Sequence, residues 1–187
     1  MMGKFSNNKS KYGSVSMFIH WLMVLMLFTL VIVGTFMVGL EREDPLKNTL
    51  YFLHKSSGAL FLQLALIRIV WRFYSRPPQL PEQLATWEKV LSKLVTASLY
   101  ALLILIPVSG IALSNAFGSP ASFFGVFEFP LLFESDLGKV EDLKLLHMSL
   151  VYLTLFVVFL HIAGAIKHRY FDKEGADVLS RMLPSRD

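Results

Sequence analysis

The sequence contains no cysteine and few charged residues, and both shortages narrow the range of proteins that it can encode. Without cysteine the chain can form no disulfide, no thiolate metal site, no iron–sulfur cluster and no covalent c-type haem linkage. Only 17% of its residues are charged, whereas a soluble domain carries about 25%. The apolar fraction is 54%, and much of it lies in long uncharged runs, which indicates a membrane protein.

Four of these runs are long enough to be membrane-spanning helices, since a bilayer core is crossed by about 20 apolar residues. They are Val15–Leu40, Tyr51–Trp71, Val95–Ser114 and Leu145–Ile166. The first is too long for a signal peptide and lacks a small-residue cleavage site, so we expect it to be retained. The connections predict an all-α protein, an antiparallel transmembrane four-helix bundle that occupies residues 1–187 as a single domain.

The third connection is long and aromatic, and the connections differ in charge. Residues 123–133 include five phenylalanines, so we expect this segment at the membrane surface over the mouth of the bundle. The N-terminal segment, the second connection and the C-terminal segment are rich in Lys and Arg, whereas the other two connections are acidic. Because positively charged loops remain in the cytoplasm, we expect both termini to face it.

All five histidines lie in or at the end of a predicted span, where ionisable residues are rare and functional by default. His20 is near the cytoplasmic start of the first helix, and His54 and His147 are near the outer starts of the second and fourth. His161 follows His147 by fourteen residues, which is about 21 Å along a helix and returns to nearly the same face. Depth therefore pairs His20 with His161 and His54 with His147.

Each predicted pair comes from two different helices, as is needed to hold one planar haem between two axial imidazoles. We therefore predict two haems in the bundle core, with iron ligands His20, His161, His54 and His147. The alternatives are histidines that simply lie at the membrane interface or form interhelical hydrogen bonds, and a zinc or copper site. A metal site gathers its ligands at one point. The inner level, with His20 and His161, is instead far from the outer level, with His54 and His147, and neither level offers a carboxylate or a thiol.

Other polar residues near the two levels have candidate roles. Arg68 lies fourteen residues after His54, at the inner level, where its guanidinium can pair with a haem propionate. Arg72 is one turn further on, and we interpret it as snorkelling to the interface. His168 follows His161 by seven residues on the same face. It is either a surface histidine in a basic patch or a proton relay at a quinone site.

Two glycines share helix faces with the predicted ligands. Gly58 lies four residues after His54, and Gly164 lies three residues after His161. Each either leaves room for a porphyrin edge or simply lets helices approach closely. Lys55 is either a partner for an outer propionate or an interfacial lysine.

Several short motifs occur in a particular order along the chain. They are Phe18–Trp21 (FIHW), Leu53–Gly58 (LHKSSG), Ile67–Arg72 (IRIVWR), Ile106–Gly110 (IPVSG), Leu146–His147 and Leu160–Phe171 (LHIAGAIKHRYF). Together, over residues 12–184, they resemble the bacterial di-haem cytochrome b561 family, which includes the membrane superoxide oxidase. The resemblance implies haem b at both histidine pairs, a multi-pass location in the bacterial inner membrane, electron exchange with ubiquinone, and His168 near the quinone.

Two departures concern superoxide chemistry more than haem binding. The third helix of the superoxide oxidase begins with histidines, whereas the corresponding stretch here, Lys89–Thr96, reads KVLSKLVT. Phe18 stands where that enzyme is expected to have a polar residue. We predict transmembrane electron transfer through two haems b, with quinone and membrane lipid as partners and no nucleic acid. A narrower hypothesis is a superoxide:ubiquinone oxidoreductase. The alternative is a haem-bearing anchor for a periplasmic redox partner or a hydrogenase, and a cofactor-free structural protein or transporter is the remaining class.

Overall fold

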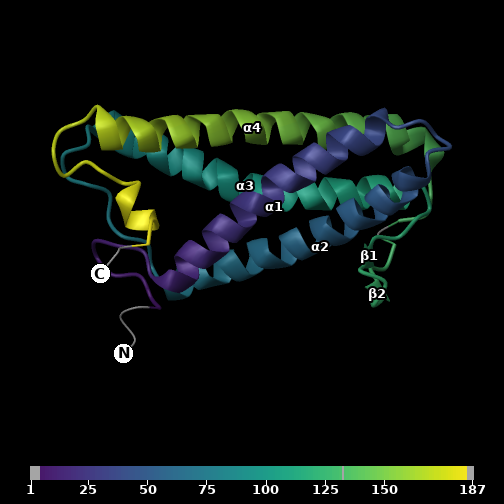
Figure 1. The fold of residues 1–187 in the computed structure, drawn as a ribbon, viewed down its shortest axis with the longest axis horizontal. Helices are drawn as coiled ribbons and strands as arrows, with labels where there is room; N and C mark the ends of the chain where they lie inside the picture. Colours follow the sequence, from purple (N-terminus) through teal and green to yellow (C-terminus); the bar gives the residue numbers. More distant parts are fainter. Residues whose placement is uncertain (1–4, 132, 185–187) are drawn as a thin grey trace. The chain divides into compact units, whose positions relative to one another are not determined.

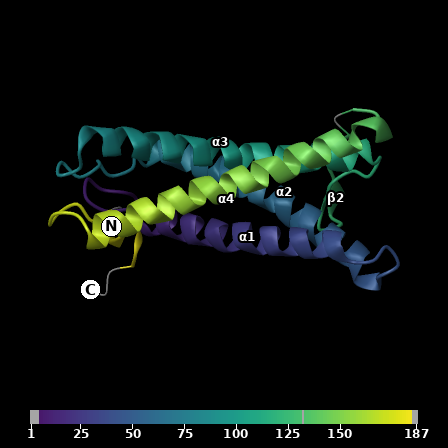
Figure 2. The same cartoon turned by 90° about the horizontal axis from the view of Figure 1, so that it is seen from above.

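Four long helices dominate the protein in the computed structural model, which describes residues 5–131 and 133–184 (Figures 1 and 2). The elements are α1 (Ser14–Gly39), α2 (Pro45–Tyr74), α3 (Thr86–Ala116), β1 (Ser122–Phe123), β2 (Phe127–Glu128), η2 (Leu137–Lys139), α4 (Val140–Tyr170) and η3 (Ser180–Met182). Each long helix is long and apolar enough to cross a membrane. The prediction of four candidate membrane-spanning helices is thus confirmed.

The starts of two helices follow from local capping. Asp44 precedes α2, and its carboxylate accepts a hydrogen bond from the Leu46 N–H at 2.8 Å, which satisfies one of the free amides of the first turn. Pro45 is the first helical residue, where its missing N–H costs nothing. At the start of α3, the Glu88 side chain reaches back to accept from the Ala85 N–H at 2.9 Å.

The described residues form two compact units, and each unit takes one stretch from every long helix. The first unit comprises the residues up to 22 together with 67–101 and those from 154 onward, and the second comprises 23–66 and 102–153. Within each unit, successive stretches of helix run in alternating chain directions. The described ends of the chain and the α2–α3 connection belong to the first unit, and the other two connections belong to the second.

The aromatic connection of the second unit contains a short hairpin, β1 paired antiparallel with β2 (Figure 1). The rings of Phe123 and Phe127 stack with centroids 5.2 Å apart. Ser56 of α2 holds the hairpin, since its Oγ donates to the Ser122 carbonyl at 2.8 Å and accepts from the Phe124 N–H at 3.2 Å. The segment is therefore attached to α2 two residues after His54.

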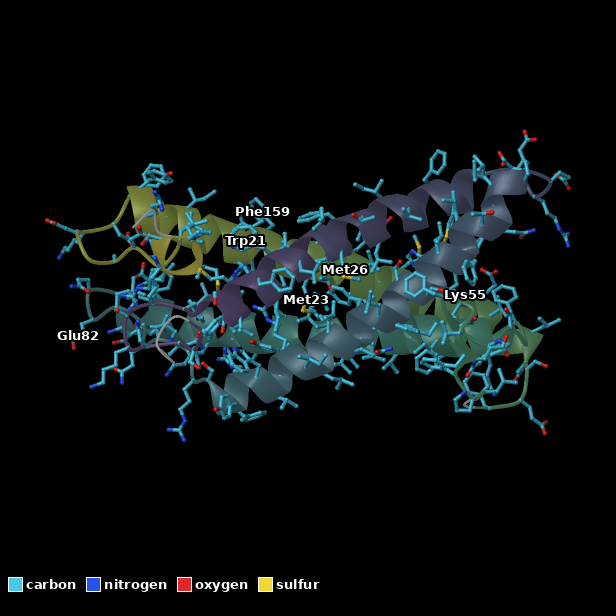
Figure 3. All side chains as sticks on the ribbon, turned by 60° about the horizontal axis from the view of Figure 1, so that its bottom comes forward. Trp21, Met23, Met26, Lys55, Glu82 and Phe159 are labelled. Atoms are coloured by element: carbon cyan, nitrogen blue, oxygen red, sulfur yellow. The ribbon has the colours of Figure 1, made fainter. Side chains whose placement is uncertain are left out.

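Large apolar side chains project outward from all four helices (Figure 3). Phe18, Val70 and Phe159 are 68%, 68% and 65% exposed, respectively. Such exposure would be costly in water but suits helices that face lipid. The buried positions of α2 are mostly small, namely Ser56, Ala59 and Ala65 beside Phe61, and small side chains let membrane helices approach closely.

Candidate haem sites

The first unit brings His20 of α1 next to His161 of α4. Their ring centroids are 6.4 Å apart, and the ring planes are inclined at 68°. The second unit brings His54 of α2 next to His147 of α4, with centroids 6.5 Å apart and planes at 85°. The two pairs are the ones that the sequence predicted from depth.

The spacing of both pairs fits one iron atom between two opposed imidazoles. A metal–imidazole bond of about 2.0 Å and a nitrogen-to-centroid distance of roughly 1.2 Å place two opposed ring centres about 6.4 Å apart. A direct N–H···N hydrogen bond would bring the centres to about 5.3 Å, and a shared tetrahedral ion to about 5.2 Å. Neither histidine pair is joined by a hydrogen bond in the described part of the chain. The residues present therefore fit a bis-histidine haem better than either alternative.

The tautomer of His147 follows from its neighbour on α3. Ser109 Oγ lies 2.7 Å from the Ile106 carbonyl, to which it donates, and 2.9 Å from His147 Nδ1. A hydroxyl has one proton, so Ser109 accepts from His147, and His147 carries its proton on Nδ1. The lone pair of Nε2 is then free for a metal. His54 differs, because its buried Nδ1 has no hydrogen-bond partner in the described residues, although the Leu30 carbonyl faces the ring.

Arg68 contacts the inner pair directly. Its Nη2 lies 3.0 Å from His20 Nδ1, and because arginine only donates, His20 accepts. This contact alone does not favour an axial role for His20, since a ligating histidine ordinarily donates from the nitrogen that does not bind the metal.

Arg68 and Arg72 form a basic pair over one aromatic ring. Their guanidinium carbons lie 5.9 and 5.0 Å from the centroid of Tyr100. Neither guanidinium has a carboxylate partner among residues 5–131 and 133–184. The pair is therefore available to an acidic group, and the interpretation of Arg72 as snorkelling to the interface stays a prediction.

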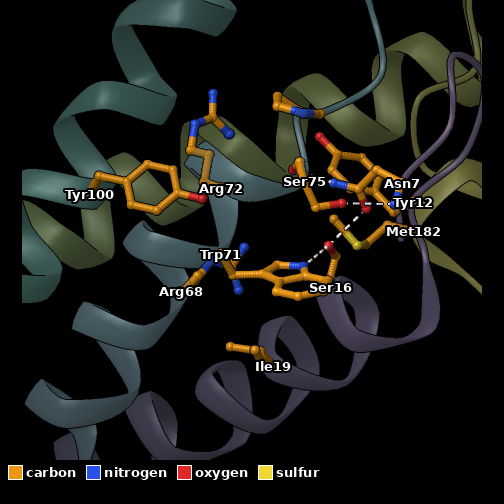
Figure 4. Close-up of a pocket in the computed structure, with 11 residues that line it drawn as sticks. Asn7, Tyr12, Ser16, Ile19, Arg68, Trp71, Arg72, Ser75, Tyr100 and Met182 are labelled. Atoms are coloured by element: carbon orange, nitrogen blue, oxygen red, sulfur yellow. Dashed lines mark hydrogen bonds between the residues drawn. The ribbon is translucent and has the colours of Figure 1, made fainter. Parts of the chain in front are cut away.

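The two arginines line a small pocket within the first unit (Figure 4). Trp71 Nε1 donates to Ser16 Oγ at 2.9 Å across it, and Tyr12 lines it as well. Burial raises the pKa of Tyr12 above its ordinary value, so the phenol is neutral at physiological pH. The pocket thus combines two cations with neutral hydrogen-bonding groups.

His168 belongs to a charged cluster at the end of α4 that the sequence did not reveal. Its Nδ1 lies 2.5 Å from Asp172 Oδ2, and its side chain is only 11% exposed. Lys167 Nζ bridges Asp172 at 2.7 Å and Glu88 of α3 at 2.6 Å. Hydrogen bonds from Lys167, and then from His168, lower the pKa of Asp172. Glu88, His168 and Asp172 are close enough to share a cation, but the Lys167 ammonium already supplies positive charge to both carboxylates.

The helix glycines nearest to the histidine ligands fall into two groups. A methyl group at Gly58 or Gly164 would meet no other atom within 4 Å, as the predicted room for a porphyrin edge requires. Gly34 and Gly110 instead lie against the rings of His54 and His147, respectively. The sequence offered no sign of either contact with histidine. Lys55 donates a 3.0 Å hydrogen bond to Ser119 Oγ, three residues before β1.

Comparisons with known proteins show which family the chain belongs to. A sequence model described as prokaryotic cytochrome b561 matches residues 11–185. Cytochrome b561 homolog 2 of Escherichia coli K12 is 31% identical over 179 residues, covering 96% of this chain and 94% of that protein. The probable superoxide oxidase CybB of Yersinia pestis is 29% identical, covering 94% and 97%, and cytochrome b561 homolog 1 of E. coli K12 is 25% identical, covering 95% and 99%. With a match along nearly its whole length and four helices able to cross a membrane, the chain belongs to the prokaryotic cytochrome b561 family.

Proposed function

We propose that this protein carries electrons across the inner membrane through two haems b and exchanges them with the ubiquinone pool. Membership of the family implies b-type haem and transmembrane electron transfer. We propose in addition that the protein holds two haems, that histidines are their ligands, and that quinone is a redox partner. The observation that supports it most strongly is the pair of histidine sites, both at the centroid separation expected for two imidazoles on one iron.

In this proposal His20 and His161 hold one haem, and His54 and His147 hold the other. Bound haem supplies reversible one-electron chemistry, and the protein supplies position and tuning. Two imidazoles on each iron leave no open coordination position, so small reactants would exchange electrons at the haem edge.

The basic pair Arg68 and Arg72 would receive the propionates of the first site. A propionate is a stronger acceptor than an imidazole, so pairing with it would draw Arg68 from His20. The Nδ1 atom of His20 could then carry its proton, as a ligating histidine requires.

The cluster around His168 would serve the quinone side. Quinone reduction consumes protons, and an imidazole can supply them near neutral pH. Asp172 orients the His168 ring through the contact at Nδ1, while Lys167 offsets the charge of the carboxylates. We place this unit, with the described chain ends, on the cytoplasmic side because of its excess of Lys and Arg.

Haem stoichiometry of single-histidine variants tests the proposal. Purified protein should show a b-type reduced-minus-oxidised spectrum and two haems per chain by pyridine haemochrome assay. His54→Ala and His147→Ala should lose the same haem, and His20→Ala and His161→Ala the other. His168→Ala is the control and should keep both. Haem-free protein from cells with ample haem, or losses that do not follow the pairs, would contradict the assignment.

Two narrower functions, oxidation of superoxide and anchoring of a protein partner, can be distinguished by experiment. Similarity to the probable superoxide oxidase of Y. pestis favours superoxide as a donor. Lys55, which directly follows His54 and donates to Ser119 Oγ, is a cation beside the second haem site. Stopped-flow superoxide decay no faster than in a haem-free control would reject that narrower function. The exposed hairpin, with Val126 and Phe127 at 78% and 47% exposure, favours instead an anchoring role for a protein partner. Purification without any bound partner would weaken it.

A further inference from the structure

Each histidine of the second site packs against a glycine of a neighbouring helix. A Cβ added to Gly34 of α1 would lie 3.0 Å from His54 Cε1, 3.5 Å from Nδ1 and 3.8 Å from Nε2. A Cβ added to Gly110 of α3 would lie 3.1, 3.5 and 3.8 Å from the same three atoms of His147. Two helices that share no sequence motif thus present the same contact to the same edge of an imidazole.

The similarity extends to the backbone. The carbonyl that faces His54 belongs to Leu30, four residues before Gly34, and the one that faces His147 belongs to Ile106, four residues before Gly110. One helical turn separates each carbonyl from its glycine on the same helix face. A glycine at this position lets the Nδ1 edge approach the carbonyl, whereas a methyl group would hold the ring away.

Close helix packing is the usual reason for a glycine in a membrane helix, but it does not describe these two positions. The three atoms nearest to the added Cβ belong, in both cases, to a histidine ring and not to a neighbouring backbone. Gly39, the last residue of α1, and Gly58 of α2 meet nothing within 4 Å. The contact with histidine is therefore a particular property of Gly34 and Gly110.

We propose that Gly34 and Gly110 are positioning residues of the second haem site, each setting the distance and plane of one axial imidazole. The inference rests on the proposed ligand role of His54 and His147. The Nδ1 edge of each ring is held against its helix, and Nε2, the farthest of the three atoms from the glycine, is left for iron. Ser109 adds a hydrogen-bond acceptor on the His147 side that His54 lacks, so the two ligands of this site are not equivalent.

Graded substitutions test the proposal, with Gly39→Ala as the matched control on α1. In Gly34→Ala and Gly110→Ala the methyl group must displace a ring by a few tenths of an ångström. We expect both variants to keep two haems per chain, but the low-spin electron paramagnetic resonance g-values of one haem to shift. In Gly34→Val and Gly110→Val we expect the count to fall from two to one. Gly39→Ala should leave both count and spectrum unchanged.

The alanine variants keep the test valid if the valine variants fail to fold, because alanine favours a helix over glycine by up to about 1 kcal/mol. Unchanged g-values in both alanine variants, or valine variants that retain two haems, would overturn the proposal. His54→Ala and His147→Ala are measured in parallel. If these two lose no common haem, the ligand assignment itself fails. If the two histidine variants lose the same haem while the glycine variants keep the haem count and g-values of the wild type, only the positioning role fails.

Discussion

Replacement of Ser109 by alanine gives a sharp test of how the second haem site is built. Ser109 is 5% exposed, and its hydroxyl is the only side-chain acceptor that His147 Nδ1 has in the described residues. Without it, the imidazole is less firmly oriented and donates less electron density through Nε2. We therefore expect weaker haem binding at this site and a higher midpoint potential, because a poorer donor stabilises ferric iron less.

The size of the effect can be bounded. Loss of an outer-shell partner of a metal-bound histidine typically costs about 10–100-fold in affinity, or about 1.4–2.8 kcal/mol. The Ile106 carbonyl also faces the ring and can take over part of the interaction, so we expect the lower end, about tenfold. Removal of the serine hydroxyl also costs the fold about 1 kcal/mol through its bond to Ile106.

Ser114→Ala controls for this loss of stability. Ser114 is 3% exposed on the same helix, and its hydroxyl donates to the Ser119 carbonyl without touching a histidine. The assay is haem transfer from each variant to excess apomyoglobin, together with redox titration. The Ser109 variant should lose one of its haems about tenfold faster or more, and the Ser114 variant should behave like the wild type. Equal haem loss and equal potentials in the two variants would refute the reasoning.

Three further predictions concern the first unit. Gly164→Leu should fold but bind one haem fewer, because its side chain enters space that is open in the protein; two haems by pyridine haemochrome would show that the clearance is not used. Arg68→Gln should lower the midpoint potential of the haem held by His20, since loss of a nearby positive charge favours ferric iron; a redox titration at low salt that shows no shift would place the propionates elsewhere. Asp172→Asn should lower the thermal unfolding temperature at pH 7. The pKa of Asp172 is lowered by hydrogen bonds from Lys167 and His168, so its stabilisation is present above the ordinary value of 3.8 and is lost as the pH falls further. The difference between the Asn variant and the wild type should therefore shrink progressively as the pH falls below 3.8, and a difference that does not shrink there would contradict this origin.

The limits of the helices show what hydropathy measures and what it omits. The predicted first span, 15–40, nearly coincides with α1. The third helix begins at Thr86, nine residues before the predicted 95, because Glu88 caps a polar first turn that extends beyond the apolar run. Similarly α2 begins at Pro45 rather than 51, after the cap from Asp44. A hydropathy window detects only the apolar part of a helix, whereas capping side chains determine where the backbone begins to coil.

The aromatic connection was only partly predictable. Its phenylalanines predicted a surface segment near the outer histidines, and whether it lies at a membrane surface stays a prediction. The hairpin depends on Phe124 and Gly125, which both have positive φ values of 50° and 76°. A phenylalanine seldom adopts this conformation, so no turn rule would have placed it there. Its attachment to Ser56 required the fold, since the two segments are far apart in the chain.

The sequence by itself determined the membrane character, the four helices and the partners within each histidine pair. These follow from the chain alone, because apolar length sets a span and alternating spans set the depth of every residue along them. Only the tertiary structure revealed the packing of His54 and His147 against glycines, the hydrogen bond from His147 to Ser109, and the cluster that holds His168. These depend on which side chains meet across helices distant in sequence, and neither periodicity nor hydropathy encodes the rotation of one helix against another.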